Sequence, residues 1–431
     1  MLNKILKKIK NKNIVIAIVG LGFVGLPLCV RFINSGNKVL GIDQDYKKIN
    51  LIKKGISYIS SIKNNELNYF KKYKNNVSTK LSKLSEADVI IICLPTPLKY
   101  NSKTPDMSYV FNFARSAKKY LKPGHTVILE STVYPGATEE LLNKLKKQNL
   151  KIGENFFLIY SPERENPGYK KINYKNIPKI CSGISKNCLL ISRHLYANIV
   201  KKTVLASTTR SAEMSKLLEN VYRAVNIGLV NEIKIICNEM NININEVINN
   251  SSTKPFGFTK FLPGPGIGGH CIPIDPYYLS WASKNYNYNP VFIKAAGDIN
   301  ASMPRWIVSK VVEKIRKQKK NKCLVIGIAY KKDVNDDRES PAYEIIHRLR
   351  KLGIKVDYHD PYIKKKGKNR KYNYELSSVN LSAEKLKFYN FVVLVTDHSC
   401  LNYKMILKHS KLIFDSRGAF NRFNSKKVIS C

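Results

Sequence analysis

Hydrophobic and polar positions alternate in blocks along the first half of the chain. Short apolar runs of strand length recur there, and glycine or proline turns follow several of them. They cover residues 14–19, 38–42, 89–93, 126–130 and 156–160. A helical segment follows the first run and ends at Gly36. Apolar strands that alternate with helices are typical of a parallel, doubly wound sheet.

The period changes between about residue 211 and residue 240. Apolar residues then recur at steps of three and four, without an internal proline. They are Met214, Leu217, Leu218, Val221, Val225, Leu229, Ile233 and Ile236. This spacing predicts one helix, roughly 45 Å long at a rise of about 1.5 Å per residue, that connects two domains.

The strand–helix pattern restarts near residue 322. We expect a helix at 341–352 and strands at 323–328, 354–358, 391–396 and 412–414. The lysine- and asparagine-rich stretch 364–374 is expected to be a solvated loop. The predicted fold class is α/β, with two Rossmann-like doubly wound domains joined by a central helical domain that holds the long connecting helix. The expected domains are 1–205, 206–310 and 311–431.

The composition changes this picture little. A chain of 431 residues suggests about two or three domains. The formal charge of +43 would suit nucleic acid or an acidic membrane surface. However, the lysines are spread along the chain and interleaved with asparagine, and no recognised nucleic-acid module is present. We therefore expect no nucleic-acid partner.

The nine cysteines form no CxxC pair and no array with metal-ligand spacing, so we expect free thiols and no metal. The basic N-terminus followed by the apolar run 14–30 mimics a secretory signal. Its Gly20, Gly22, Gly25 and Pro27 suit a tight turn better. No later stretch has the length needed to span a bilayer. We expect a cytoplasmic protein without a membrane partner.

A dinucleotide fingerprint, Gly-Leu-Gly-Phe-Val-Gly at 20–25, follows the first predicted strand and opens a helix. Its glycines permit a tight turn and close approach of a pyrophosphate, and the helix N-terminus attracts the phosphates. Asp43 ends the second strand, where an acid binds a ribose diol and disfavours NADP. The expected cofactor is NAD, with contacts from Gly20, Gly22, Phe23, Val24, Gly25, Asp43 and Thr96. The second α/β unit has only Gly327-Ile328-Ala329, so a second NAD is not expected there.

A glycine-rich loop at 264–276 presents Cys271 with a carboxylate, Asp275, four residues further on. A thiol on such a turn can attack a bound carbon. Taken alone, the loop is equally compatible with an ordinary turn that carries an incidental cysteine. For His270 we expect a structural or pocket-lining role.

Together these features resemble the nucleotide-sugar 6-dehydrogenase family, which includes UDP-glucose and GDP-mannose dehydrogenases. The resemblance runs from about residue 14 to about residue 420, and the motifs occur in the family order. They are the fingerprint, 131–136 (STVYPG), 161–168 (SPERENPG), 212–220 (AEMSKLLEN), the cysteine loop, and 327–331 (GIAYK) with 337–340 (DRES).

The resemblance implies NAD-dependent oxidation of a sugar C6 alcohol to a carboxylate through a thiohemiacetal and a thioester on Cys271. Lys216 and Asn220, four residues apart on one helix, would stabilise the oxyanion at C6, and Asp275 would handle water or a proton. Glu163 would be the base for thioester hydrolysis, and Thr132 would position the water. A solvated Lys216 and a helix-capping Thr132 are the alternatives without that context. Glu165, a second acid beside Glu163, could alter its pKa.

The substrate contacts implied by the resemblance are Lys331, Arg338, Phe258, Phe261 and Gly268. His270, residues 272–279 and the motif at 161–168 resemble the branch that acts on UDP-N-acetylhexosamines, with UDP-N-acetyl-D-glucosamine favoured. UDP-N-acetyl-D-mannosamine, UDP-N-acetyl-D-galactosamine and UDP-glucose remain alternatives, and the uronate would serve surface polysaccharide. A basic nucleic-acid-binding or NAD-sensing protein on a decayed enzyme scaffold is the competing class. A homodimer or higher homo-oligomer through the long helix is expected.

Overall fold

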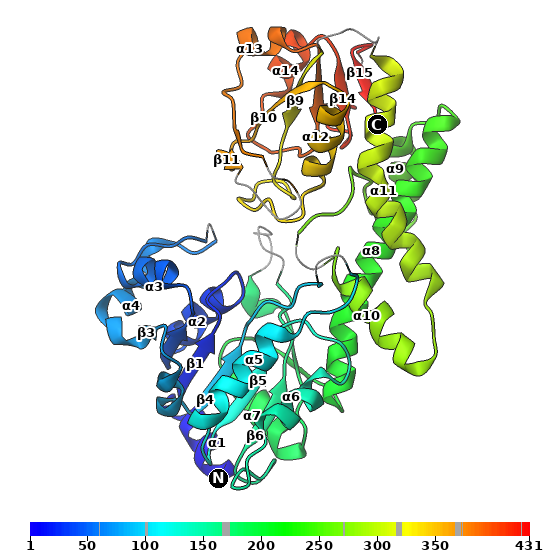
Figure 1. Cartoon of the computed structure of the whole chain (residues 1–431). Coiled ribbons are helices and arrows are strands. Elements are labelled where there is room, and N and C mark those ends of the chain that lie inside the picture. Colours follow the sequence, from blue (N-terminus) through cyan, green and yellow to red (C-terminus); the bar gives the residue numbers. More distant parts are fainter. Residues whose placement is uncertain are drawn as a thin grey trace. The chain divides into compact units, whose positions relative to one another are not determined.

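The fold consists of two compact units, each of which contains a parallel sheet with helices (Figure 1). Unit 1 comprises Met1–Glu219 and Tyr277–Asn287, and unit 2 comprises Asn220–Pro276 and Tyr288–Cys431. The predicted α/β class is confirmed. The computed structural model describes residues 1–59, 61–99, 102–165, 173–269, 272–315, 321–366, 372, 374–423 and 425–431.

The sheet of unit 1 has six parallel strands in the order β3-β2-β1-β4-β5-β6. Its central strands are buried almost throughout, which explains why they read as continuous apolar runs. The strands are β1 (Val15–Val19), β2 (Lys38–Ile42), β3 (Val77–Ser78), β4 (Val89–Ile92), β5 (Thr126–Leu129) and β6 (Phe157–Tyr160). A separate parallel pair joins β7 (Lys179–Cys181) to β8 (Thr203–Leu205).

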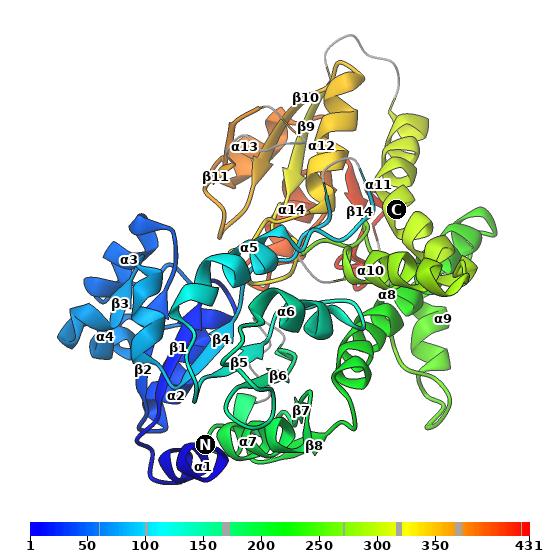
Figure 2. The same cartoon turned by 60° about the horizontal axis from the view of Figure 1, so that its bottom comes forward.

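The helices of unit 1 start at side-chain caps where the sequence provides them. Asp45 caps α3 (Tyr46–Lys53), and Ser185 caps α7 (Lys186–Ala197). The helix α1 (Leu2–Lys10), which the sequence analysis did not predict, buries Ile5 and packs against α7 (Figure 2). The remaining helices are α2 (Gly25–Asn34), α4 (Asn68–Lys72), α5 (Ser108–Ala117) and α6 (Ala137–Leu145).

The predicted long helix is present as α8 (Thr209–Glu239). Its apolar positions divide between two faces: Leu217 and Val221 are buried, whereas Leu218 and Leu229 are exposed. Three further helices follow it: α9 (Ile244–Ser251), α10 (Asp275–Ser283) and α11 (Val291–Lys314). Across the described ranges, no helix is both long enough and apolar enough to cross a membrane.

The sheet of unit 2 has five parallel strands in the order β10-β9-β13-β14-β15. They are β9 (Lys322–Ile326), β10 (Lys355–His359), β13 (Phe391–Leu394), β14 (Ile413–Asp415) and β15 (Val428–Ser430). Ser340 caps α12 (Pro341–Lys351), and a proline at the first helical position also suits this start. Two short helices, α13 (Ala383–Phe388) and α14 (Tyr403–His409), complete the unit.

The solvated loop expected at 364–374 is wrong for its described start. Strand β11 (Lys365–Lys366) pairs antiparallel with β12 (Leu376–Ser377). Lys366 is buried, and its ammonium donates to the backbone carbonyl of Tyr374 at 2.8 Å. The same ammonium lies 4.3 Å from the centre of the Tyr374 ring. Hydrogen bonding and cation–π attraction offset the cost of burying this charge. Residues 367–371 and 373 lie outside the described part.

Candidate active site

The fingerprint turn joins β1 to α2 with a backbone that only glycine tolerates. Gly20 has φ +90°, and a Cβ there would lie 2.6 Å from the Cys93 carbonyl oxygen. A Cβ on Gly25 would collide with the Gly20 carbonyl. At Gly22, by contrast, a Cβ would meet nothing within 4 Å, so this glycine leaves an open face. The turn fits the close approach of a pyrophosphate to the N-terminus of α2.

Asp43 follows β2 with its carboxylate held by the backbone. The N–H of Leu21 donates to Oδ2 at 2.8 Å, and the N–H of Asp45 donates to Oδ1 at 2.9 Å. Lys48 Nζ lies 3.4 Å from Oδ2. These bonds link the carboxylate directly to the fingerprint turn. An anion fixed there suits a ribose diol and would repel a 2′-phosphate.

The ends of β4 and β5 are joined by side-chain hydrogen bonds. Thr96 Oγ1 donates to the Thr132 carbonyl at 2.7 Å, and Ser131 Oγ donates to the Leu94 carbonyl at 2.7 Å. Tyr278 donates its hydroxyl to the Thr96 carbonyl at 2.8 Å. Thr96 and Thr132 are therefore neighbours at the carboxyl edge of the sheet, where ligands bind in open α/β folds.

Glu163 lies in the loop after β6 and is surrounded by donors. Its Oε1 accepts the N–H groups of Arg164 and Glu165, each at 2.7 Å. Its Oε2 lies 3.7 Å from Arg31 Nη1 and 3.9 Å from Lys179 Nζ. Burial acts to raise the pKa of Glu163, but Lys179, Arg31 and the two N–H groups together hold it below the ordinary value. The group is therefore held as the anion.

Glu165 does not leave Glu163 with an uncompensated neighbour, because its own carboxylate pairs with Arg31 Nη2. Burial raises the pKa of Glu165 above its usual range. Residues 166–168 of the same motif lie outside the described part.

The sequence did not predict a cluster of buried polar residues beside Glu163. Lys179 donates to Glu130 Oε2 at 3.0 Å, and Tyr196 donates its hydroxyl to the other oxygen of Glu130. Burial raises the pKa of Glu130. The available signal was an acid, Glu130, at the end of an otherwise apolar strand.

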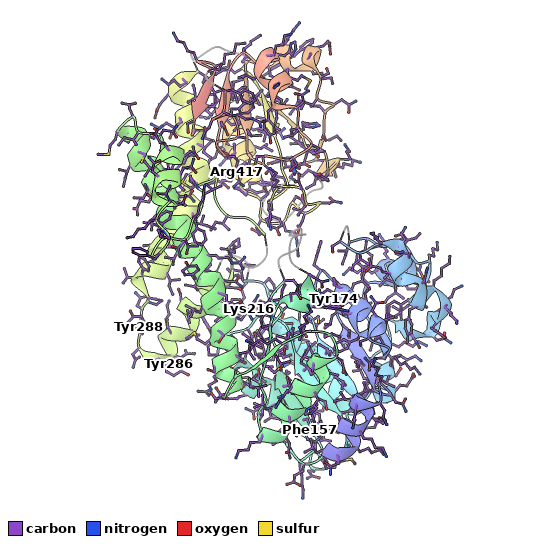
Figure 3. All side chains as sticks on the ribbon, turned by 180° about the vertical axis from the view of Figure 1, so that it is seen from behind. Phe157, Tyr174, Lys216, Tyr286, Tyr288 and Arg417 are labelled. Carbon is purple, nitrogen blue, oxygen red and sulfur yellow. The ribbon has the colours of Figure 1, made fainter. Side chains whose placement is uncertain are left out.

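Helix α8 begins with a buried acid and a buried lysine. Glu213 accepts the N–H of Gly136 at 2.6 Å and both the N–H and the hydroxyl of Thr138, at 2.9 and 2.6 Å. It therefore caps α6. Lys216 lies one turn later on α8 (Figure 3), and it is only 7% exposed. The alternative of a solvated Lys216 is wrong.

In unit 2, Asn220 and Asp275 form a buried hydrogen bond, in which the Asn220 side-chain amide donates to Asp275 Oδ2. Arg223 donates to Asn220 Oδ1, which fixes the orientation of the amide. Arg223 was not predicted, although its place three residues after Asn220 puts it on the same helix face. Asp275 is the first residue of α10.

Cys271 and His270 lie outside the described residues, but the glycines before them are described. The N–H of Gly269 donates to the Arg338 carbonyl at 2.9 Å. A Cβ on Gly268 would lie 2.7 Å from Tyr330 Cβ, so the loop packs tightly against the segment that carries Lys331. Further upstream, the N–H of Gly264 donates to Asn231 Oδ1 at 2.9 Å, and Gly264 lies against the guanidinium of Arg417.

The other predicted substrate residues of unit 2 have mixed environments. Lys331 is partly buried, and burial together with Arg223 lowers its pKa. Arg338 forms a bidentate pair with Asp336, at 2.9 and 2.6 Å. Phe261 packs edge-on against Tyr222, with ring centroids 5.8 Å apart, whereas Phe258 is exposed.

Family models of the UDP-glucose/GDP-mannose dehydrogenase family match nearly the whole chain. The NAD binding domain covers residues 14–200, the central domain 210–302, and the UDP binding domain 324–422. These matches agree with the two α/β regions and the helices between them.

Individual relatives give the same result. The chain is 36% identical to a UDP-N-acetyl-D-glucosamine 6-dehydrogenase of Pseudomonas aeruginosa, over 82% of this chain and 84% of that one. It is 34% identical to a UDP-N-acetyl-D-mannosamine dehydrogenase of Methanococcus aeolicus, over 91% and 87%. The solved UDP-D-ManNAc dehydrogenase of Pyrococcus horikoshii superimposes with a TM-score of 0.83 at 30% identity, covering 94% and 96%. The chain belongs to the UDP-glucose/GDP-mannose dehydrogenase family and is an NAD-dependent UDP-sugar 6-dehydrogenase.

Proposed function

We propose that the substrate is a UDP-N-acetylhexosamine, with UDP-N-acetyl-D-glucosamine as the first choice. The similarity to the Pseudomonas aeruginosa enzyme and the sequence Ile-Pro-Ile-Asp at residues 272–275 support this choice. UDP-N-acetyl-D-mannosamine is the second candidate, because relatives named for that activity are almost as similar. The uronate product would serve the synthesis of surface polysaccharide.

The observation that carries the proposal is the buried hydrogen bond between Asn220 and Asp275. Asp275 stands four residues after Cys271 in the sequence. The family chemistry removes two hydrides from C6, and NAD⁺ accepts both. Cys271 adds to the C6 aldehyde, which forms a C–S bond and retains the reactive intermediate. After the second oxidation the same bond is a thioester. Water then breaks it, which releases the carboxylate and the thiol.

Three polar residues of α8 and α10 suit the charge that develops at C6. Lys216 and Asn220 would stabilise the oxyanion, because fixed donors that need no reorganisation are effective in this role. Asp275 would orient Asn220 and handle the proton. The burial of Asn220 and Asp275 and the bonds around Asn220 support the preorganisation of these two groups.

Hydrolysis of the thioester would be assisted by Glu163 as base, with Thr132 positioning the water. The anionic state of Glu163 supports this role, since a base must be deprotonated before it acts. Lys331 and Arg338 would contact the UDP group, while Phe258, Phe261 and Gly268 would shape the sugar site. The domain boundaries 205/206 and 310/311 stay a prediction.

We also propose a homodimer formed through α8. Five large apolar side chains on this helix are between 42% and 61% exposed. They are Met214, Leu218, Tyr222, Leu229 and Ile236. At 3.6 residues per turn they fall within an arc of about 80°, so they form one continuous stripe. A second copy of the same helix would cover that stripe by isologous pairing.

The deciding experiment is NADH formation with a panel of UDP-sugars. We expect the highest kcat/KM with UDP-N-acetyl-D-glucosamine and two NADH per uronate formed. A higher kcat/KM for the manno epimer would move the assignment to the second candidate. Cys271→Ser should lose complete turnover. One NADH per sugar with free aldehyde as the product would exclude the covalent route.

A further inference from the structure

We propose that Lys179 is a positioning residue for thioester hydrolysis, which ties the loop that carries Glu163 to the strand end that carries Thr132. This inference rests on the proposed function of Glu163 and Thr132. Lys179 would touch neither the substrate nor the cofactor, and would act only through the two acids beside it.

The ammonium of Lys179 lies between two carboxylates from different strand ends. It is 3.0 Å from Glu130 Oε2 and 3.9 Å from Glu163 Oε2, and only 8% of its side chain is exposed. Its Nζ also lies 4.9 Å from the centre of the Tyr196 ring, whose hydroxyl donates to Glu130. These two carboxylates and the ring restrict the position of the ammonium group.

The two acids that Lys179 joins stand close in the sequence to the two residues proposed for hydrolysis, or are one of them. Glu130 directly follows β5 and stands two residues before Thr132. Glu163 stands three residues after the end of β6, the strand that pairs with β5. One buried cation therefore links the two neighbouring strand ends from which the proposed hydrolytic residues come.

Arg31 completes the cluster from the cofactor helix α2. Its guanidinium pairs with both Glu163 and Glu165, and its Cζ lies 4.5 Å from the centre of the Tyr174 ring. Thus the anion of Glu163 is held by α2 on one side and by β7 on the other. The loop cannot shift without breaking a partly or fully buried ion pair.

The charge balance of the cluster protects the ionised form of Glu163. Among the described residues, the three acids Glu130, Glu163 and Glu165 pair with two cations, Lys179 and Arg31. Burial raises the pKa of Glu130 and of Glu165, whereas the cations lower that of Glu163. A proton taken up by the cluster therefore goes to Glu130 or Glu165 first. Glu163 stays available as a base.

The test is Lys179→Met, examined with stopped-flow NADH measurements and intact-mass analysis. We expect kcat to fall about 10- to 100-fold, part of what a general base contributes, with the Kd for NAD⁺ unchanged. Because both oxidations precede hydrolysis, a burst of about two NADH per subunit should appear before the slow phase. A protein adduct of the sugar-nucleotide acyl group should accumulate. The acid limb of the kcat profile should move to higher pH, since Glu163 loses a counter-charge.

Three further variants separate positioning from folding. Lys179→Arg keeps the cation and should recover most of the rate. Lys179→Met combined with Glu130→Gln removes a charge of each sign, so it should fold even where the single variant does not, and should still show the burst. Lys8→Met removes a more exposed ion pair, with Asp88 at 2.5 Å, elsewhere in unit 1 and should leave kcat unchanged.

Two results would overturn the inference while leaving the proposed function intact. One is a folded Lys179→Met, alone or with Glu130→Gln, that turns over without a burst or an adduct. The other is a Lys179→Met variant in which the first oxidation slows as much as overall turnover does. Failure of the proposed function has a different signature, because wild-type protein would then form no NADH with any UDP-sugar of the panel.

Discussion

Replacing Asp43 by asparagine should weaken NAD⁺ binding with little effect on the chemical step. In the native protein both oxygens of Asp43 are oriented by backbone N–H groups, at 2.8 and 2.9 Å. Asparagine keeps the size of the side chain and one acceptor, so the Leu21 N–H need not lose its partner. What disappears is the negative charge that would accept the ribose hydroxyls.

The expected loss follows from the strength of a hydrogen bond to a charged group. Such a bond contributes about 1.5–3 kcal/mol, and asparagine retains part of it. We therefore expect a loss of about 1–2 kcal/mol, or an increase of about 5- to 30-fold in the KM for NAD⁺. The kcat should change little, because the ribose contact is made equally in the ground state and the transition state.

The assay is steady-state NADH formation with NAD⁺ or NADP⁺ varied at saturating UDP-sugar. The KM for NADP⁺ should fall relative to that for NAD⁺, since the anion that repels the 2′-phosphate is gone. Asp45→Asn is the matched control, because the Asp45 side chain caps α3, where its Oδ1 accepts the Lys47 N–H at 2.9 Å. An unchanged KM for NAD⁺ in Asp43→Asn would refute the reasoning. An equal loss in Asp45→Asn would do the same.

Three further predictions concern stability and assembly. Glu213→Ala leaves donors at the start of α6 without their acceptor and should lower the free energy of unfolding by about 2–4 kcal/mol in urea titrations. Glu213→Gln should retain most of the native free energy of unfolding. Equal losses in the two variants would contradict the capping role. Burial lowers the pKa of Lys234 on α8 to about 8, so the folded protein releases this proton before the unfolded chain does. The free energy of unfolding should then rise by about 1.4 kcal/mol per pH unit between about pH 8 and 10.5 relative to Lys234→Met, and parallel pH profiles would disprove it. Leu218→Glu should shift sedimentation toward the monomer, whereas Leu352→Glu should not, because Leu352 is similarly exposed but lies at the C-terminal cap of α12. Unchanged sedimentation of Leu218→Glu would count against the α8 interface.

The strands were predictable because burial on both faces leaves a continuous apolar run. Strand β2 was predicted with its observed bounds, and β1 and β4 within one residue. The same logic fails for short or exposed elements. Strand β15 is partly exposed and only three residues long, so its pattern does not differ from that of a loop. Lys366 reads as a solvated residue because its aromatic and carbonyl partners come together only in the folded chain.

The site shows the same division between local and tertiary information. The fingerprint turn and the α8 residues follow from spacing along the chain, which the sequence displays directly. The partners of Glu163 do not follow from spacing, because Arg31 lies on α2 and Lys179 on β7, both separate in the sequence from the loop that carries Glu163. A basic chain offers many lysines, and no local pattern marks Lys179 as the one that becomes buried beside Glu130. Ion pairs between distant elements therefore remain invisible until the sheet is assembled.

Both sheets have a glycine turn after one strand and an aspartate after the neighbouring strand. The two aspartates differ in their hydrogen bonds and therefore in what they can bind. Gly327 follows β9 as Gly20 follows β1, with φ +83° and +90°, and Asp360 follows β10 as Asp43 follows β2. Asp360, however, is fully buried, and its Oδ2 accepts the N–H groups of Ile328 and Ala329 at 2.7 and 2.9 Å and faces His398 Nε2 at 3.2 Å. Its Oδ1 accepts two more N–H groups, at 2.8 and 3.0 Å. A carboxylate with five donors has no capacity left for a ribose diol, so this acid holds the turn that leads to Lys331 instead of binding a second NAD.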